Sequence, residues 1–569
     1  MDNSLRDFIA PDGTKIVYRS WTPETDSQGI IVLLHRGHEH LGRMETMAHY
    51  FSHRGYTVYA WDARGNGRSE GERDSAESFS VFAQDLQCFI QLIQEETGQS
   101  TKEMVIIASS MGAVIATSWV HDYAPKIRGL IIATPAFSIR LYVPFAIPLL
   151  SLARKWSLMP RVSSYVKSKV LTHDRKQQAI YNQDPLISSS ISTDLLIDTY
   201  KTGQRLIDDA SAITTPTLVL CAGQDWVVSR RAQRRFYTRL GSLHKEWAYF
   251  PNFYHALFHE DDTDPVFERC FTFIEQRFAT PYIDEDFTNA DKCGVSRDKY
   301  DQLSLPNYNP VYPITRWTLS TIGQLSDGIA LGLKHGFDSG SSLDYVYKNQ
   351  ANGKAIIGKT IDRIYLNSPG WNGVRARKLL LETLLHQSIN PADSFHILDI
   401  ASGNGSYLLD QLNRYPNLHV EMRDFSQDNV TIIGERINQL AASERATAIH
   451  ADAFDASSYL EEHSFDLAIC SGLFELFPDN NPVKIALAGM AKQLKPGGYL
   501  IYTNQPWHSQ QEFIAKTLGS HRNQPWIMRC RTQAEMDALV AQSGLEKQHM
   551  LIEPSGMFSV SIARKPLKQ

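Results

Sequence analysis

The 569-residue sequence has few cysteines, no long apolar run and no excess of one charge. Its six cysteines lie far apart, so they do not form the spacing of a disulfide framework or a metal site, and we expect reduced thiols. Fifty-seven basic residues stand against 62 acidic ones, a formal net charge of −5. A balance of this kind lacks the electrostatic footprint of a nucleic-acid-binding protein, so we expect no nucleic-acid partner.

No stretch reaches the 18 or more apolar residues of a membrane-spanning helix, and the longest candidate, residues 142–153, is interrupted by Pro144 and Pro148. The first residues are polar and lack the basic and apolar regions of a secretory signal. We therefore expect a cytoplasmic protein. At about 150 residues per domain, the length allows two to four domains.

Residues 105–109 are an apolar run that leads into Ser110 and then Gly112, which predicts a strand that turns sharply into a helix. Such a turn holds a serine hydroxyl exposed beside a base, as a nucleophile requires. Ala108 occupies the first glycine position of the G-x-S-x-G pattern. Because a match of this kind arises by chance roughly 0.4 times in a chain this long, it needs support from elsewhere in the sequence.

Two further apolar runs supply that support, since one ends at Asp225 and the next at His255. Serine, aspartate and histidine in this order, each after a strand, is the chain order of α/β-hydrolases. We therefore predict the catalytic residues Ser110, Asp225 and His255. The strand predicted at residues 30–34 leads into a loop where the N–H of Gly37, with that of Met111, is expected to form an oxyanion hole.

Residues 1–280 resemble the monoacylglycerol lipase and lysophospholipase branch of the α/β-hydrolases. The family's H-G-x-x-E-H loop corresponds to residues 35–40, with Arg36 in place of glycine, and its D-x-R-G-x-G-x-S loop corresponds to residues 62–69. The resemblance implies an α/β-hydrolase fold and hydrolysis of an acyl-lipid ester such as a monoacylglycerol or lysophospholipid. The same scaffold also supports peptidases and thioesterases. Several histidines of the first loop raise the alternative of a metal cluster, but the family uses this loop structurally, so we expect no metal.

A cap insertion is expected at residues 136–205, where this family interrupts the hydrolase domain. Its apolar side chains have two interpretations: they line an acyl tunnel or enter a membrane surface, which implies peripheral contact with the inner membrane face, or they pack on the hydrolase core. These side chains are Leu141, Val143, Phe145, Ile147, Leu149 and Leu150.

Residues 281–369 differ in character, with proline, tyrosine, asparagine and glycine scattered among them, and we interpret them as a linker and entry segment. A new alternation of strands and helices follows, so a second domain is expected at residues 370–569.

The second domain opens with a predicted strand at residues 395–400 and a turn of small residues before a helix, an arrangement that brings backbone close to a ligand. A dinucleotide-binding fingerprint needs a third glycine, where this chain has Leu408. The segment instead resembles motif I of class I S-adenosylmethionine-dependent methyltransferases, D-x-G-x-G-x-G, read here as Asp399, Ala401, Gly403 and Gly405. The resemblance implies a Rossmann-like fold and S-adenosylmethionine as cofactor.

Later positions extend this resemblance. Asp424 ends the next predicted strand, where the family holds the ribose, and Asp452 and Ala453 match the family's adenine site. Residues 494–498 match its L-K-P-G-G turn, and a closing hairpin is expected near the C-terminal end. Each acid taken alone also fits a turn cap, a solvated strand end or an Asx turn.

The sequence thus predicts a serine hydrolase fused to a methyltransferase, both catalytic. The alternative is that one domain is catalytic and the other is a degenerate binding module, since Arg36 and the two alanines replace glycines of the family patterns. The sequence does not identify the methyl acceptor.

Overall fold

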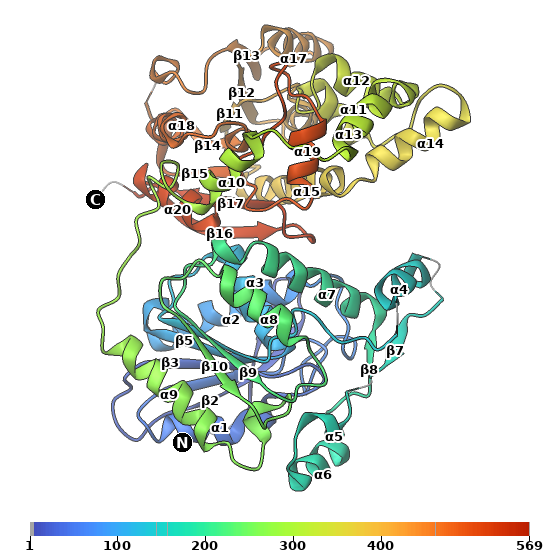
Figure 1. Ribbon diagram of the computed structural model, residues 1–569. Coiled ribbons are helices and arrows are strands. Elements are labelled where there is room, and N and C mark those ends of the chain that lie inside the picture. The colour runs from blue at the N-terminus through green and yellow to red at the C-terminus, as the bar shows by residue number, and fades with distance from the viewer. Residues whose placement is uncertain (1–4, 144, 156–157, 165, 461, 568–569) are drawn as a thin grey trace. The chain divides into compact units, whose positions relative to one another are not determined.

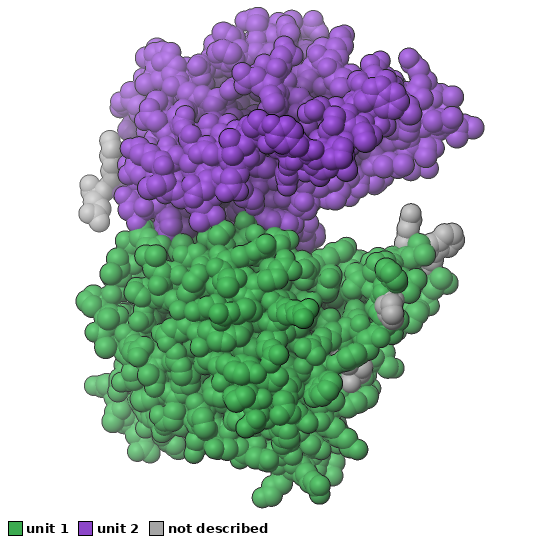
Figure 2. All heavy atoms as spheres, in the orientation of Figure 1, with its two compact units in different colours: residues 1–285 green, residues 286–569 purple. Residues whose placement is uncertain are grey.

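The computed structural model describes residues 5–143, 145–155, 158–164, 166–460 and 462–567 (Figure 1). They divide into two compact units, Met1–Glu285 and Asp286–Gln569, which Figure 2 colours separately. Within the described ranges no helix has both the length and the apolar character needed to cross a membrane.

The first unit is built on an eight-stranded sheet with the order β1-β2-β4-β3-β5-β6-β9-β10. β1 and β2 run antiparallel to their neighbours and the remaining strands are parallel. This order confirms the α/β-hydrolase fold. The strands are β1 (Arg6–Ile9), β2 (Lys15–Trp21), β3 (Ile30–Leu34), β4 (Thr57–Trp61), β5 (Met104–Ser109), β6 (Gly129–Ala133), β9 (Thr217–Ala222) and β10 (Lys245–Phe250).

Helices cover both faces of this sheet, so its central strands are fully buried and read as continuous apolar runs. α1 and α9 contribute to one hydrophobic core with the strands, while α2 and α3 pack together elsewhere on the unit. The helices are α1 (Glu45–Ser52), α2 (Ser80–Thr97), α3 (Met111–Tyr123), α8 (Arg230–Arg239) and α9 (Asp264–Phe278).

The expected cap region, residues 136–205, lies between β6 and β9. It consists of helices and a small antiparallel pair of strands, β7 with β8. Its last helix packs closely on the chain that leaves β6, because a Cβ on Gly203 would lie 2.3 Å from the carbonyl oxygen of Phe137. Pro144 lies outside the described residues. The elements are α4 (Ala146–Lys155), β7 (Arg161–Ser163), α5 (Ser168–Leu171), α6 (Arg175–Gln183), β8 (Ser190–Ser192) and α7 (Thr193–Asp208).

The second unit contains a seven-stranded sheet with the order β13-β12-β11-β14-β15-β17-β16, in which β17 runs antiparallel between β15 and β16. This is the strand order of class I methyltransferases, and β16 and β17 form the expected hairpin. The strands are β11 (Phe395–Ile400), β12 (Leu418–Asp424), β13 (Ala446–His450), β14 (Phe465–Cys470), β15 (Leu494–Asn504), β16 (Glu546–Ile552) and β17 (Ser559–Arg564).

Two hydrophobic cores flank this sheet. One includes α15 and α17, and the other includes α18 and α20. The helices are α15 (Pro369–Ser388), α16 (Ser406–Leu409), α17 (Gln427–Gln439), α18 (Asn480–Gln493), α19 (Gln511–Thr517) and α20 (Gln533–Gln542).

Residues 281–369, interpreted from the sequence as a linker and entry segment, are largely helical, and from Asp286 onward they belong to the second unit. Serine side chains cap two of these helices: Ser326 accepts a hydrogen bond from the Ile329 N–H and Ser339 accepts one from the Ser342 N–H. The scattered small and turn-forming residues therefore include helix ends. The helices are α10 (Val295–Ser304), α11 (Val311–Ser320), α12 (Asp327–His335), α13 (Gly340–Lys348) and α14 (Ala355–Leu366).

Candidate active sites

Ser110 occupies a strained turn between β5 and α3, with φ +53° and ψ −113°. The turn is held by a hydrogen bond of 2.9 Å from the Ser110 N–H to the Ala133 carbonyl. Gly112 is required on the helical side, because a Cβ there would lie 2.3 Å from the His35 carbonyl oxygen. Ala108 lies within buried β5, so its methyl group does not prevent the sharp turn.

The structure brings Ser110, His255 and Asp225 together in one chain of hydrogen bonds. His255 Nε2 lies 2.9 Å from Ser110 Oγ, and its Nδ1 lies 3.0 Å from Asp225 Oδ2. Backbone N–H groups of Val227 and Val228 donate to Asp225 Oδ1 at 2.8 and 2.9 Å. Because Oδ1 is engaged in this way, the carboxylate presents Oδ2 to the imidazole. His255 Nδ1–H then donates to Asp225, and Nε2 is able to accept the serine proton.

Gly37 and Met111 lie next to each other beside Ser110, since a Cβ on Gly37 would be 3.5 Å from the Met111 Cβ. Both residues line the same cavity as Ser110. Among the hydrogen bonds of the described residues, neither N–H has an acceptor. Two N–H groups beside a nucleophile are the arrangement of an oxyanion hole.

Arg36, which replaces a family glycine, forms a buried two-bond ion pair with Glu39, in which Nε lies 2.9 Å from Oε2 and Nη2 contacts Oε1. Burial opposes ionisation of Glu39, but the charge of Arg36 outweighs it and holds the pKa of this carboxyl well below its usual range. The arginine is therefore accommodated within the loop by its own acidic partner.

The histidines of this loop each have a structural partner. His35 Nε2 accepts from the Ala63 N–H at 3.0 Å, while His38 and His40 pair with aspartates at 2.7 and 2.8 Å. Burial lowers the pKa of His35, which fits a neutral ring. The described part of the chain contains no group of three or more histidine, cysteine or acidic residues able to hold a metal ion.

A cavity of about 470 Å³ opens over Ser110 and is lined mainly by apolar side chains of the cap. The apolar cap residues considered from the sequence divide into two sets. Leu141, Val143, Leu149 and Leu150 line the cavity, whereas Phe145 and Ile147 do not, and Phe145 is 79% exposed. Leu152 is also exposed.

In the second unit, the turn after β11 has three residues in the left-handed region: Ala401 (φ +57°), Gly403 (φ +58°) and Gly405 (φ +63°). This backbone conformation is strained for alanine. Ala401 nevertheless adopts it, so the turn keeps a left-handed residue at the position where the family has glycine. Asp424, at the end of β12, fixes the turn because its Oδ2 accepts the Gly403 N–H at 2.8 Å.

Asp399 is buried near the end of β11, where the side chains of Tyr407 and Ser402 interact with its carboxyl group. Burial raises the pKa of this carboxyl to about 7. A buried carboxyl with a raised pKa that lines a cavity beside the glycine turn is a candidate ligand-binding group.

These motif residues line two adjoining cavities. The larger, about 830 Å³, is lined by Gly403, Asp424, Asp452 and Ala453, together with Phe425. The smaller, about 60 Å³, includes Asp399 and Gly405, and both cavities include Ala401 and Gly403. Asp452 also forms an Asx turn, since its Oδ1 accepts the Phe454 N–H at 2.8 Å. The structure thus brings all the motif residues predicted from the sequence to one connected site.

Sequence reasoning missed α13, which covers the glycine turn. Asp344 accepts hydrogen bonds from Asn404 Nδ2 at 3.0 Å and from Ser406 Oγ at 2.6 Å, and it pairs with Arg436 at 2.9 Å. Gly340 lies against the turn, because a Cβ there would be 3.0 Å from Asn404 Oδ1. The capping residue Ser339 was the sequence feature that could have indicated the start of this helix.

Comparison with known families assigns a different family to each half of the chain. Residues 270–565 match the family described as "Putative methyltransferase", and residues 25–262 match the family described as "Serine aminopeptidase, S33". The chain is 42% identical over 570 residues to "Uncharacterized protein YnbC" of Escherichia coli strain K12, which covers 98% of this chain and 97% of that protein.

The N-terminal half has further relatives. It is 27% identical over 274 residues to "Monoacylglycerol lipase" of Mycolicibacterium smegmatis, covering 48% of this chain and 96% of that protein. Among solved structures, a soluble variant of monoglyceride lipase from Saccharomyces cerevisiae is 20% identical, with a TM-score of 0.45, and covers 49% of this chain and 97% of its own.

Proposed function

Because this chain belongs to the methyltransferase family that matches its second half and carries a monoacylglycerol lipase-like hydrolase domain before it, we propose that it is a bifunctional enzyme. The first unit hydrolyses an acyl-lipid ester such as a monoacylglycerol or a lysophospholipid. The second transfers a methyl group from S-adenosylmethionine.

The hydrogen-bonded chain from Ser110 through His255 to Asp225 is the observation that carries the hydrolase proposal. His255 Nε2 takes the hydroxyl proton as Ser110 Oγ attacks the ester carbonyl, and Asp225 holds the imidazole in the required tautomer. The N–H groups of Gly37 and Met111 stabilise the oxyanion. His255 then protonates the leaving alcohol, and water, activated by the same histidine, releases the fatty acid. The apolar cavity over Ser110 suits an acyl chain.

Fluorophosphonate labelling tests this proposal, because the probe reacts with an activated serine. Wild-type protein is expected to be labelled at Ser110 and to hydrolyse a short-chain nitrophenyl ester, and Ser110→Ala is expected to lose both. Ser109→Ala is the matched control, since Ser109 is the last residue of β5 and has no contact with His255 among the described hydrogen bonds. Ester hydrolysis retained by Ser110→Ala would overturn the assignment.

The exposed cap side chains support peripheral contact with a membrane. Phe145 and Leu152 are 79% and 58% exposed and do not line the cavity, whereas Leu150 does. Serine at both Phe145 and Leu152 is therefore expected to weaken binding to anionic liposomes and leave short-chain ester hydrolysis unchanged. Leu150→Ser is expected to reduce long-chain hydrolysis instead. Equal liposome binding by all three proteins would exclude membrane contact through this face.

For the second unit, the two adjoining cavities that the motif residues line, of about 830 and 60 Å³, support a site for S-adenosylmethionine. Asp424 would hold the ribose hydroxyls, Asp452 and Ala453 the adenine, and the turn from Ala401 to Gly405 the methionine portion. When bound, this cofactor supplies an electrophilic methyl group. Asp399, close to the turn, provides a carboxylate for its cationic portion.

Calorimetry on the full chain tests the cofactor. S-adenosylmethionine is expected to bind and NAD is not, because the third glycine of a dinucleotide site is replaced by Leu408. Since the pKa of Asp399 is raised to about 7, the affinity is expected to increase as pH rises from 6 to 8, when this carboxyl ionises. Asp399→Asn is expected to remove that pH dependence. NAD binding without S-adenosylmethionine binding would overturn the methyltransferase assignment.

The alternative, one active unit and one degenerate binding module, is separated by the same two measurements. Labelling of Ser110 without cofactor binding would favour an active hydrolase alone. Cofactor binding without labelling would favour an active methyltransferase alone.

A further inference from the structure

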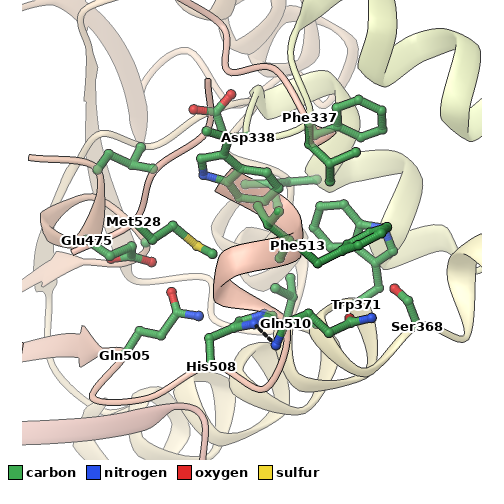
Figure 3. A pocket seen from close by; sticks show the side chains of 18 of the residues that line it. Phe337, Asp338, Ser368, Trp371, Glu475, Gln505, His508, Gln510, Phe513 and Met528 are labelled. Carbon is green, nitrogen blue, oxygen red and sulfur yellow. Dashed lines mark hydrogen bonds between the residues drawn. The ribbon is translucent and has the colours of Figure 1, made fainter. Parts of the chain in front are cut away.

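The second unit contains another cavity, of about 150 Å³, that none of the motif residues explains (Figure 3). Its walls are largely apolar and include six aromatic side chains, two of which, Trp371 from α15 and Trp526, stack with ring centroids 5.9 Å apart and an interplanar angle of 28°. Stacked aromatic walls favour a flat apolar ligand. The volume is below the 300–1,000 Å³ or so of sites for drug-sized molecules, which favours a ligand of about one ring. The aromatic lining residues are Phe337, Tyr365, Trp371, Phe513, Trp526 and Phe558.

This cavity adjoins the 830 Å³ cavity, because Asp338, Leu343, Gly472 and Leu476 line both. Gly472 belongs to the loop after β14 and has φ +75°. A Cβ on this glycine would lie 3.0 Å from Nη2 of Arg377, so the boundary between the two cavities is closely packed. A molecule in the aromatic cavity therefore lies next to the proposed cofactor site.

Three N–H donors on residues that line the aromatic cavity are buried and have no partner among the described residues: Gln505 Nε2, Trp526 Nε1 and Arg377 Nε. Gln505, which follows β15, is 2% exposed and extends toward the cavity (Figure 3). Unpartnered buried donors are destabilising and uncommon. Three such donors around one largely apolar cavity fit a ligand that brings an oxygen acceptor into it.

His508, which also lines this cavity, is neutral and acts as a donor. Burial lowers its pKa to about 4, and its Nδ1 accepts the Gln510 N–H at 3.0 Å. The proton of the neutral ring therefore lies on Nε2. This arrangement excludes Nε2 as the atom that accepts a proton from a ligand.

Two acidic residues line the cavity, and one of them is already engaged. Asp338 accepts the His521 N–H at 2.6 Å and pairs with the His521 ring at 2.8 Å. Glu475, in the loop after β14, is 8% exposed, and its described side-chain contact is a long one, 3.3 Å from Arg377 Nη1 to Oε1. Glu475, which forms a buried ion pair with Arg377 through Oε1, is therefore the carboxylate left to contact a ligand in this cavity.

We propose that the aromatic cavity binds the methyl acceptor and that this acceptor is a small aromatic compound with a phenolic hydroxyl. A phenolic oxygen accepts a hydrogen bond from Gln505 and donates its proton to Glu475. It therefore provides a partner for the buried N–H donor and for the carboxylate. A carboxylate ligand would satisfy the donors but would be repelled by Glu475.

The inference rests on the proposed methyltransferase function. The O–H bond of the acceptor breaks and its proton passes to the Glu475 carboxylate. The oxygen forms a bond to the methyl carbon of the sulfonium donor, and the methyl–sulfur bond breaks with its electron pair remaining on sulfur. The products are a methyl aryl ether and the demethylated thioether.

Calorimetry on the full-length protein with three matched probes tests the proposal: p-cresol, p-xylene, which lacks the hydroxyl, and p-toluate, which carries a carboxylate. p-Cresol is expected to bind at least about tenfold more tightly than p-xylene, as one hydrogen bond of about 1.4 kcal/mol requires. Gln505→Leu is expected to remove that difference and leave p-xylene binding unchanged. Gln548→Leu is the control, since Gln548 is exposed on β16.

Two further variants keep the test decisive if Gln505→Leu does not fold. Trp526→Phe removes a single donor and is expected to weaken p-cresol more than p-xylene. Glu475→Gln is expected to bind p-cresol and S-adenosylmethionine as the wild type does, but to form no methyl ether by mass spectrometry.

The outcomes separate this inference from the function on which it rests. S-adenosylmethionine binding with equal affinities for p-cresol and p-xylene would overturn the acceptor proposal and leave the methyltransferase proposal intact. Tighter binding of p-toluate than p-cresol would also overturn it, in favour of a carboxylate acceptor. Absence of S-adenosylmethionine binding would overturn the proposed function, and the acceptor role with it, even if p-cresol binds.

Discussion

Replacing Asp424 by asparagine turns one carboxylate oxygen into an amide nitrogen and keeps the shape of the side chain. Oδ1 accepts the Ser426 N–H at 2.8 Å and Asn429 Nδ2 at 3.0 Å, whereas Oδ2 accepts the Gly403 N–H alone. The amide oxygen is expected to replace Oδ1, because that orientation keeps two hydrogen bonds. Its NH₂ group then faces the Gly403 N–H, and the bond that fixes the glycine turn is lost.

The magnitude follows from the burial of this contact, since Asp424 is 7% exposed. A hydrogen bond to a charged group contributes about 1.5–3 kcal/mol, so we expect a loss of about 2 kcal/mol in the free energy of unfolding of the second unit. At about 2–4 °C per kcal/mol for domains of a few hundred residues, the melting temperature is expected to fall by about 4–8 °C. Affinity for S-adenosylmethionine is expected to fall at least about tenfold, because the turn and the proposed ribose contact are both disturbed.

Differential scanning calorimetry of the full chain measures the shift, and isothermal titration measures the affinity. Asp455→Asn is the control: this exposed aspartate accepts hydrogen bonds from Ser457 in a surface turn, and we expect no measurable change in melting. An Asp424→Asn protein that melts with the wild type would refute the idea that this carboxylate holds the turn.

Three further changes test other parts of the structure. Asp225→Asn is expected to lower kcat on a short-chain ester by about 10⁴-fold, as in other triads, by favouring the wrong tautomer of His255, and a loss below tenfold would contradict this role. Gly112→Ala is expected to destabilise the first unit by about 1–3 kcal/mol in urea unfolding, because the new Cβ would meet a backbone carbonyl at 2.3 Å; unchanged stability would show that the elbow adapts. Burial alone would lower the pKa of His121, but hydrogen bonds to Asp122 and Asp209 raise it above its usual value. The stability that protonated His121 gives the folded state is therefore complete below the unfolded pKa of about 6.5, and it is lost as pH rises through the folded value. His121→Gln is expected to flatten the dependence of urea unfolding on pH above 6.5, and parallel curves would exclude this contribution.

The sequence predicted the strand ends of both sheets well, for a physical reason. Parallel strands covered on both faces are nearly continuous apolar runs, as in β5 and β9, so the polar residue that follows such a run, Ser110 or Asp225, marks the edge where sites form. The order of these residues along the chain, together with the family resemblances, then supplied the catalytic and cofactor candidates.

The covering elements were harder to predict. α10 to α14 are short helices whose ends carry proline, glycine and asparagine, so their composition resembles that of a loop. The contacts of Asp344 with the glycine turn depend on tertiary packing that no local pattern encodes. The aromatic cavity joins Trp371 and Trp526 from distant parts of the sequence, and neither residue belongs to a recognisable motif.

The loop after β14 lines two cavities at once, with Gly472 and Leu476 contributing to both. Two ligands that share a wall can alter each other's affinity, and thermodynamic linkage requires the effect to be equal in both directions. If a filled cofactor cavity tightens acceptor binding tenfold, a filled acceptor cavity tightens cofactor binding tenfold. Titrations performed in the two orders therefore close a cycle, and the coupling free energy they share measures how strongly this short loop connects the two sites.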